Sequence, residues 1–164
     1  MIIKTNNLVL KTVDQISDSL KAKMVLDDNF TNMTEVKIYP PNLPTEFTFE
    51  IINDENVIGE LKLKSFRWFN RKAEISIFIL KEFRNKGYGS EAIGTIIKYA
   101  FEKLNLHRLE AEVIEYNEGS KKMIEGFGFI LEGRLREAKY STGKYYDILQ
   151  YGLLKSEFNK RRNK

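Results

Sequence analysis

The pattern of hydrophobic and polar positions changes its period several times along this chain, and each change marks a predicted element. A period of two, typical of strands with one buried face, runs through seven segments. These segments are residues 8–13, 47–52, 57–69, 73–80, 108–116, 129–140 and 145–154. Polar turns at residues 53–56 and 141–144 predict two hairpins, and the second, third and fourth strands predict an antiparallel meander.

The helical period of 3.6 is clearest over residues 88–104, where apolar side chains recur on one face. Two further helices are expected, over residues 14–26 and from Asn117 to Gly126 or Gly128, and both open with a residue of the N-cap type. This order of strands and helices predicts a mixed α+β sheet and disfavours a fold of repeated βαβ units.

Composition predicts one folded domain over residues 1–164. Apolar residues make up 42% of the chain and aromatic residues 12%, which is typical of a protein with a sizeable core. Residues 27–45 follow neither period and hold all three prolines, so a loop or short helix is expected there. The absence of cysteine excludes a disulfide framework, a thiolate metal site and a thioester-forming nucleophile.

The ends of the chain and its charge add little chemistry. The net charge is +4, part of it in a basic tail over residues 158–164, which we expect to be a solvated end rather than a nucleic-acid patch. The N-terminus lacks the regions of a signal peptide, and no apolar run approaches a membrane span. We therefore expect a cytoplasmic protein with no nucleic-acid or membrane partner, and a single histidine predicts no metal cluster.

A basic turn punctuated by glycines, FRNKGYGSEA over residues 83–92, leads directly into a predicted helix. The start of a helix presents unpaired backbone N–H groups and the positive end of the helix dipole. Gly87 and Gly89 would let an anion approach these groups, and Arg84 and Lys86 add positive charge. The turn therefore predicts a phosphate site.

Three phosphate-binding motifs are candidates for this turn, and each requires a different spacing of its residues. The P-loop pattern fails because no lysine follows the relevant glycine. Residues 87–92 match the dinucleotide pattern GxGxxA, with Glu110 or Glu112 about 20 residues further on, but residues 81–86 separate the pattern from its strand. A capped helix start with a solvated basic turn is the alternative without a ligand.

The third phosphate interpretation comes from a family resemblance. Residues 84–89 resemble the R/Q-x-x-G-x-G/A coenzyme A pyrophosphate loop of the GNAT acetyltransferases. The blocks RKAEISIFI, AFEKLNLHRLEAEV, YNEGSKKMIEGFGFILEGRLRE and TGKYYD are also similar to family blocks, in the family's order. The likeness covers residues 71–154 and is strongest to the ribosomal-protein N-terminal and spermidine acetyltransferase branches, while residues 1–45 match only loosely.

The resemblance implies a GNAT fold of the α+β class. Such a fold has a mixed, mostly antiparallel, twisted sheet of about six or seven strands flanked by about four helices. Two central strands splay apart and form the coenzyme cleft.

The resemblance also implies acetyl-CoA as co-substrate and assigns residues to it. The pantetheine arm is expected along the backbone of Ile77, Phe78 and Ile79. Asn117 and Ser120, which match the motif N-x-x-[SA], are expected on the other wall, with a helix cap as their alternative role. The pyrophosphate is expected on the segment Arg84, Asn85, Lys86, Gly87, Tyr88, Gly89 and Ser90.

Acetyl transfer to an amine needs a base, because an ammonium ion has no lone pair. Glu112 matches the position of the base in some family members, and Glu74 is the second candidate; either is alternatively an exposed strand carboxylate. Many members carry a tyrosine acid where this chain has Ile124, so Tyr116, Tyr140 or solvent would have to protonate the leaving thiolate. With no cysteine, direct attack in a ternary complex is expected.

The expected acceptor is a primary amine, with a protein N-terminal α-amine as the first interpretation. The alternatives are a polyamine or another small amino compound, and a weakly catalytic sensor that binds acyl-CoA. An acidic acceptor pocket would favour the polyamine, and Asp27, Asp28 and Glu35 are the residues to examine. Residues 145–147 match the family's G-x-x-x-D segment and are expected to pack in the last strand pair, with contact to the substrate wall as the alternative. A monomer or homodimer is expected.

Overall fold

The computed structural model describes residues 2–4, 9–11, 13, 15, 17–26 and 42–162. The chain forms two compact units, Met1–Ile38 and Tyr39–Lys164, and each is described by itself. The single domain expected over residues 1–164 stays a prediction.

The first unit contains a small strand pair and a short helix. β1 (Ile2–Lys4) pairs antiparallel with β2 (Val9–Lys11). α1 (Asp18–Val25) follows Ser17, whose hydroxyl accepts a hydrogen bond from a backbone N–H at 3.3 Å. The described helix therefore starts later than expected, because Ser17 supplies its cap; Asp14 lies outside the described residues.

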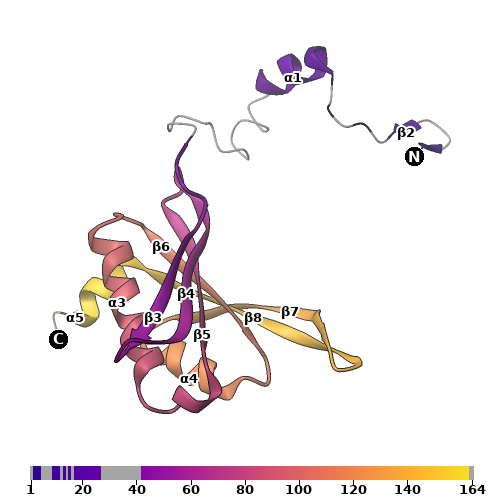
Figure 1. Cartoon of the computed structure of the whole chain (residues 1–164). Helices are drawn as coiled ribbons and strands as arrows, with labels where there is room; N and C mark the ends of the chain where they lie inside the picture. The colour runs from indigo at the N-terminus through magenta and orange to yellow at the C-terminus, as the bar shows by residue number, and fades with distance from the viewer. Residues whose placement is uncertain are drawn as a thin grey trace. The chain divides into compact units, whose positions relative to one another are not determined.

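Six strands form one sheet in the second unit, in the order β3-β4-β5-β6-β8-β7 (Figure 1). They are β3 (Phe47–Asn53), β4 (Asn56–Arg67), β5 (Lys72–Ile79), β6 (Arg108–Ile114), β7 (Ile130–Ser141) and β8 (Lys144–Leu154). Neighbouring strands pair antiparallel except β5 and β6, which are parallel. The mixed, mostly antiparallel sheet and its β3-β4-β5 meander are confirmed.

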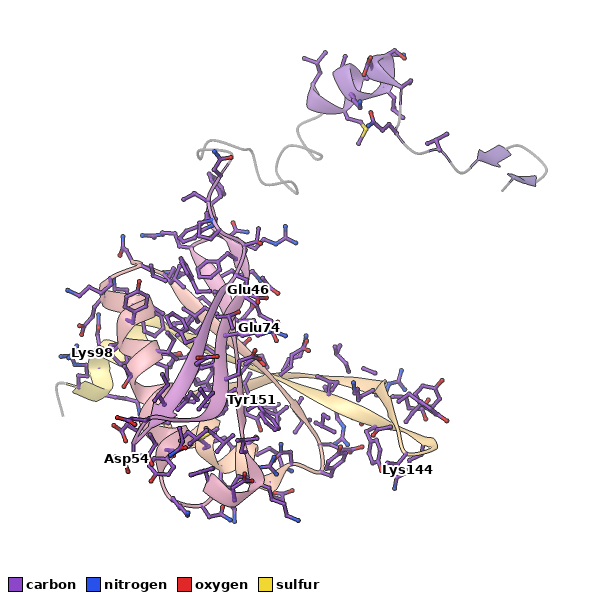
Figure 2. All side chains as sticks on the ribbon, viewed as in Figure 1. Glu46, Asp54, Glu74, Lys98, Lys144 and Tyr151 are labelled. Carbon is purple, nitrogen blue, oxygen red and sulfur yellow. The ribbon has the colours of Figure 1, made fainter. Side chains whose placement is uncertain are left out.

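Both predicted hairpins close through two-residue turns with left-handed backbone. Asp54 and Glu55 have φ values of 46° and 68° between β3 and β4, and Thr142 and Gly143 have 49° and 84° between β7 and β8. Two successive positive φ values are typical of the turn whose twist matches that of paired strands. The second hairpin projects from the sheet with Lys144 near its tip (Figure 2).

Three α-helices accompany the sheet. α3 (Tyr88–Glu102) carries the chain from β5 to the parallel strand β6, after a short 3₁₀ turn, η1 (Lys81–Phe83). α4 (Glu118–Gly126) starts after Asn117, whose side chain accepts the N–H of Ser120 at 3.1 Å, as the sequence predicts. The third is α5 at the C-terminal end.

The solvated basic tail expected over residues 158–164 stays a prediction: residues 159–162 are exposed, but they belong to a helix. α5 (Lys155–Arg162) is helical, and the ring of Phe158 packs against that of Phe101 with centroids 5.2 Å apart. Arg162 also forms an ion pair with Glu102 of α3. One apolar residue among many charges therefore docks the tail, because its ring is partly buried against the core.

A single cluster of buried side chains joins the sheet to α3 and α4. α3 contributes its apolar face, as the helical period predicts: Ile93, Ile96, Ile97, Ala100 and Phe101. Full burial of a large aliphatic or aromatic side chain contributes about 1.5–3 kcal/mol, so this face anchors the helix. None of the helices in the described ranges is long and apolar enough to cross a membrane.

Gly59 marks a close approach between β4 and β5. It pairs with Ile79, and a Cβ added there would lie 2.3 Å from the backbone oxygen of Phe78. A backbone oxygen in a strand ladder cannot move without disturbing its hydrogen bonds. The position of β5 therefore depends on the missing side chain.

We predict that Gly59→Ala lowers the free energy of unfolding by about 1–3 kcal/mol, because the methyl group forces β4 and β5 apart. Urea denaturation of wild type and variant measures the difference. Gly126→Ala is the matched control, since no atom lies within 4 Å of a Cβ at that position. Equal stability of the two variants would contradict the close approach.

Candidate active site

The site lies where the two parallel strands separate. β5 and β6 pair over four positions, from Lys72 with Arg108 to Ile75 with Ala111. Both strands then continue, to Ile79 and Ile114, without further pairing to each other. The strands therefore splay as expected, and the edge of β5 beyond Ile75 faces open space instead of a neighbour.

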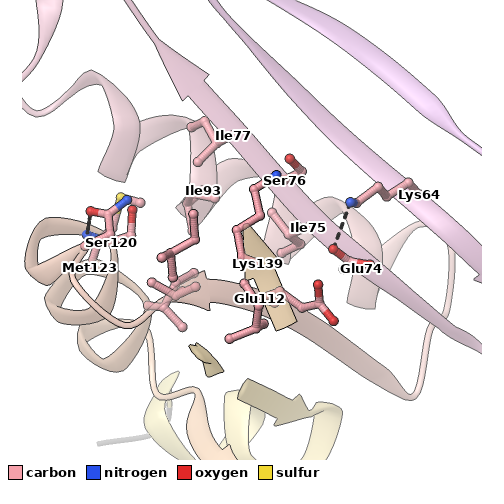
Figure 3. Close-up of a pocket in the computed structure, with 16 residues that line it drawn as sticks. Lys64, Glu74, Ile75, Ser76, Ile77, Ile93, Glu112, Ser120, Met123 and Lys139 are labelled. Atoms are coloured by element: carbon pink, nitrogen blue, oxygen red, sulfur yellow. Dashed lines mark hydrogen bonds and ion pairs between the residues drawn. The ribbon is translucent and has the colours of Figure 1, made fainter. Parts of the chain in front are cut away.

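Two cavities occupy this split and share part of their lining. The inner chamber, of about 430 Å³, lies between the strands and the start of α4 (Figure 3). The loop chamber, of about 380 Å³, lies over the turn before α3. Four residues line both chambers, namely Ile77, Asn117, Ser120 and Met123. The chambers thus form one continuous cleft.

The loop chamber has the geometry of an anion site. Gly87 is the N-cap of α3 with a φ of 88°, and it has no side-chain capping partner within the described chain. The first intrahelical bond runs from the N–H of Glu91 to the oxygen of Gly87, at 3.0 Å. The N–H groups of residues 88–90 therefore have no acceptor within the helix, and the positive end of the helix dipole lies at the same place.

The cationic side chains of this turn are held against aromatic rings. The Nε of Arg84 donates to the backbone oxygen of Ile79 at 2.8 Å, and its guanidinium lies 5.6 Å from the centroid of Phe78. The Nζ of Lys86 lies 5.3 Å from the ring of Phe83. The unpaired backbone amides could therefore hold an anion, with the two charges placed beside them.

The structure gathers most of the predicted binding residues around the loop chamber. Its lining includes Ile77, Phe78, Ile79, Arg84, Asn85, Gly87, Gly89, Ser90, Asn117 and Ser120. Lys86 and Tyr88 do not line it, and the hydroxyl of Tyr88 lies 3.4 Å from the side-chain oxygen of Asn53 on β3. The assignment of these residues to a coenzyme stays a prediction.

Carboxylates of β5 and β6 differ sharply in their partners. Glu74 forms an ion pair with Lys64 at 2.9 Å, and its side chain is 18% exposed. Glu110 accepts hydrogen bonds from Lys72 and Arg108, both at 2.9 Å. Burial opposes ionisation of Glu110, but these bonds and the positive charges that make them lower its pKa overall.

Glu112 is the exception in this group. It lines the inner chamber (Figure 3), and none of the ion pairs formed within residues 42–162 involves it. A carboxylate that faces a cleft without a cationic partner is free to accept a proton from a bound molecule.

The position of the family's tyrosine acid is apolar. Ile124 is 4% exposed and lines the inner chamber. Tyr116 packs edge-to-face on Tyr146 with centroids 4.7 Å apart, and Tyr140 packs on Tyr145 at 5.0 Å. Neither tyrosine lines either chamber, so within the described residues no tyrosine hydroxyl faces the cleft.

Sequence reasoning missed two cations of the inner chamber, Lys64 on β4 and Lys139 on β7. Strand alternation alone could not find them, because it indicates the face of a residue but not the strands that border a cavity. Over the described ranges, no three His, Cys, Asp or Glu side chains are grouped as a metal ion requires.

Comparisons with known proteins agree on the family. Residues 10–149 match the model of the acetyltransferase (GNAT) domain. A Bacillus subtilis protein named "Putative ribosomal N-acetyltransferase YdaF" is 38% identical over 66% of this chain and 59% of its own length. A spermidine N(1)-acetyltransferase of Vibrio cholerae is 32% identical over 63% of this chain and 60% of its own length. The matches thus span about three fifths of these relatives.

Solved structures support the same assignment. The spermidine N-acetyltransferase of Vibrio cholerae in complex with CoA and spermine superposes with a TM-score of 0.67 and 30% identity. The superposition covers 70% of this chain and 69% of that one. With the domain match over residues 10–149 and the splayed cleft, this chain belongs to the GNAT family of acetyltransferases.

Proposed function

We propose that this chain transfers an acetyl group from acetyl-CoA to a primary amine, with Glu112 as the base. The observation that carries the proposal is that two different chemical groups lie at opposite ends of one cleft. An anion site at a helix start lies at one end, and a carboxylate without an ion-pair partner in residues 42–162 lies at the other.

The successive parts of coenzyme A would fit along the cleft, from the pyrophosphate to the pantetheine arm. The amides of residues 88–90 would hold the pyrophosphate, and Arg84 would add charge beside it. The free edge of β5 at Ile77–Ile79 would pair with the amide groups of the pantetheine arm, as an added strand would. Asn117 and Ser120 would contact the arm from α4, because both line the two chambers. A related structure contains CoA, which supports this co-substrate.

The transfer step balances without a covalent enzyme intermediate. Glu112 accepts a proton from the acceptor ammonium, directly or through water, and frees the nitrogen lone pair. The nitrogen attacks the thioester carbonyl carbon, so that a C–N bond forms and the C–S bond breaks. The electron pair leaves on the coenzyme sulfur, the amide nitrogen releases its second proton to solvent, and the thiolate takes a proton from solvent.

The apolar side chain of Ile124 does not prevent this step. A thiol with a pKa of about 8.5 is only mildly basic, so its thiolate is a tolerable leaving group near neutral pH. Solvent in the cleft can protonate it afterwards.

The first expectation about the acceptor has to be revised. A protein N-terminal amine was the first interpretation, but relatives and structural neighbours named for spermidine support a small amine at least as well. We therefore propose a small primary amine as the acceptor. Asp27, Asp28 and Glu35, expected to distinguish a polyamine pocket, lie outside the described residues.

Incubation with acetyl-CoA and a panel of small amines and N-terminal peptides tests the proposal. Release of free coenzyme A thiol with an acceptor gaining one acetyl by mass supports it. Binding of acetyl-CoA with no turnover on any acceptor would instead indicate the sensor alternative.

We predict that Glu112→Gln lowers kcat about 10²–10⁴-fold, because the amide cannot take the ammonium proton. Initial rates of thiol release at saturating acetyl-CoA measure the effect. Glu74→Gln is the matched control on the neighbouring strand: its carboxylate is paired with Lys64, so we expect a smaller loss. A larger loss in the control would transfer the base role to Glu74.

We also predict that Gly89→Val abolishes the thermal upshift that acetyl-CoA gives the wild type. A Cβ at Gly89 already lies 3.6 Å from the Sδ of Met123 and 3.7 Å from Ile79, so the two further methyl groups would obstruct the phosphate position. The wild-type shift corresponds to about 2.7 kcal/mol at 100 times Kd. Thr95→Val on the same helix is the control that should keep the shift; an undiminished shift in Gly89→Val would place the coenzyme elsewhere.

A further inference from the structure

Lys139 is an unexplained cation of the inner chamber. It belongs to β7, at the far side of β8 from β6, yet it lines the same chamber as Glu74 and Glu112. Figure 3 shows its side chain extending into this chamber. The transfer step described above makes no use of it.

The charges around the chamber leave two groups without ion pairs. Lys64 is neutralised by Glu74 at 2.9 Å. None of the ion pairs made inside residues 42–162 involves Lys139 or Glu112. The chamber therefore presents one available cation and one available carboxylate, separate from each other. A bound molecule with one positive and one negative group would complement both.

A distorted stretch of β7 comes immediately before Lys139. Leu135 pairs with Ile148 and Lys139 with Tyr146, so residues 136–138 bulge opposite the single residue Asp147. Glu137 in this bulge has a φ of 51°, in the left-handed region that a side chain disfavours. Bulges of this kind redirect side chains beside functional sites.

Asp147 holds the bulge in place. Its Oδ1 accepts the N–H of Glu137 at 2.8 Å, and its Oδ2 accepts a hydrogen bond from Arg134. Arg134 also donates to Glu115 at 2.5 Å, and Glu115 accepts the N–H of Asp147 at 3.0 Å. The Glu137 N–H foremost, and then Arg134, lower the pKa of Asp147, because both favour its ionised form.

We infer that the acceptor amine carries a carboxylate, which Lys139 binds while Glu112 takes the ammonium proton. This inference rests on the proposed acetyl transfer and names its substrate class: a small amino acid rather than a polyamine. A polyamine would bring a second cation next to Lys139, and like charges at close range repel in a partly enclosed site. Asp147 acts as a positioning residue, because it reaches the acceptor only through the bulge that orients Lys139.

Matched acceptors test the inference directly. Each α-amino acid of a panel is compared with its own carboxamide, and spermidine is included as the polyamine; acetylated products are quantified by mass. We expect kcat/KM to favour the acids over their carboxamides by about 10-fold or more, since a charge-assisted hydrogen bond is lost in the amide. Equal values for acids and carboxamides, or turnover of spermidine above every acid, would overturn the inference.

Variants assign the preference to a residue. Lys139→Met should lower kcat/KM for the acids about 10- to 100-fold more than for the carboxamides, mainly through KM, and Lys139→Arg should restore part of the loss. Lys144→Met removes one charge from the same hairpin, where the Nζ lies 4.8 Å from the Tyr146 ring, and should leave the preference intact. Asp147→Asn should weaken the preference while keeping the thermal upshift by acetyl-CoA. A uniform loss on acids and carboxamides in Lys139→Met would contradict the role of Lys139.

The outcomes separate the two proposals. Turnover of carboxamides or spermidine without a preference for acids overturns the inference and leaves acetyl transfer standing. No turnover on any acceptor, with acetyl-CoA bound, overturns the proposed function and the substrate class together.

Discussion

The site depends on the point where β5 and β6 stop pairing. Four parallel pairs hold the strands together, and after Ile75 and Ala111 they diverge. Backbone groups inside a sheet normally have partners on both sides, so a strand that loses one neighbour presents a row of donors and acceptors. Here that row borders a cleft between the sheet and α4, which makes it a template for an extended ligand rather than an exposed edge.

The two ends of the cleft obtain their chemistry from different sources. At the loop end, main-chain amides at a helix start are left without acceptors in the helix, and the basic side chains are held by Ile79 and two aromatic rings. At the inner end, the chemistry depends on which side chains are already paired. Lys64 and Glu74 neutralise each other, so Glu112 and Lys139 keep charges available for a ligand.

Several elements could be predicted from local patterns because local interactions produce them. The apolar stripe of α3, the Asn117 cap of α4 and the two hairpin turns need only neighbouring residues. The tail could not be predicted in this way. Lys155–Arg162 has a polar composition throughout most of its length, and its helix is held by the packing of the partly buried Phe158 against Phe101, more than fifty positions earlier.

The sequence by itself determined the family, the mixed sheet and the glycine-punctuated turn before α3, because ordered blocks, alternation and glycine placement are local properties. Only the tertiary structure decided which charged residues meet. Glu112 and Glu110 stand two apart on one strand, yet Glu110 is engaged by Lys72 and Arg108 while Glu112 faces the chamber. Lys139 reaches that chamber through a bulge that Asp147 fixes. Whether a lysine of β7 lies beside a carboxylate of β6 depends on strand order and register, which no single segment encodes.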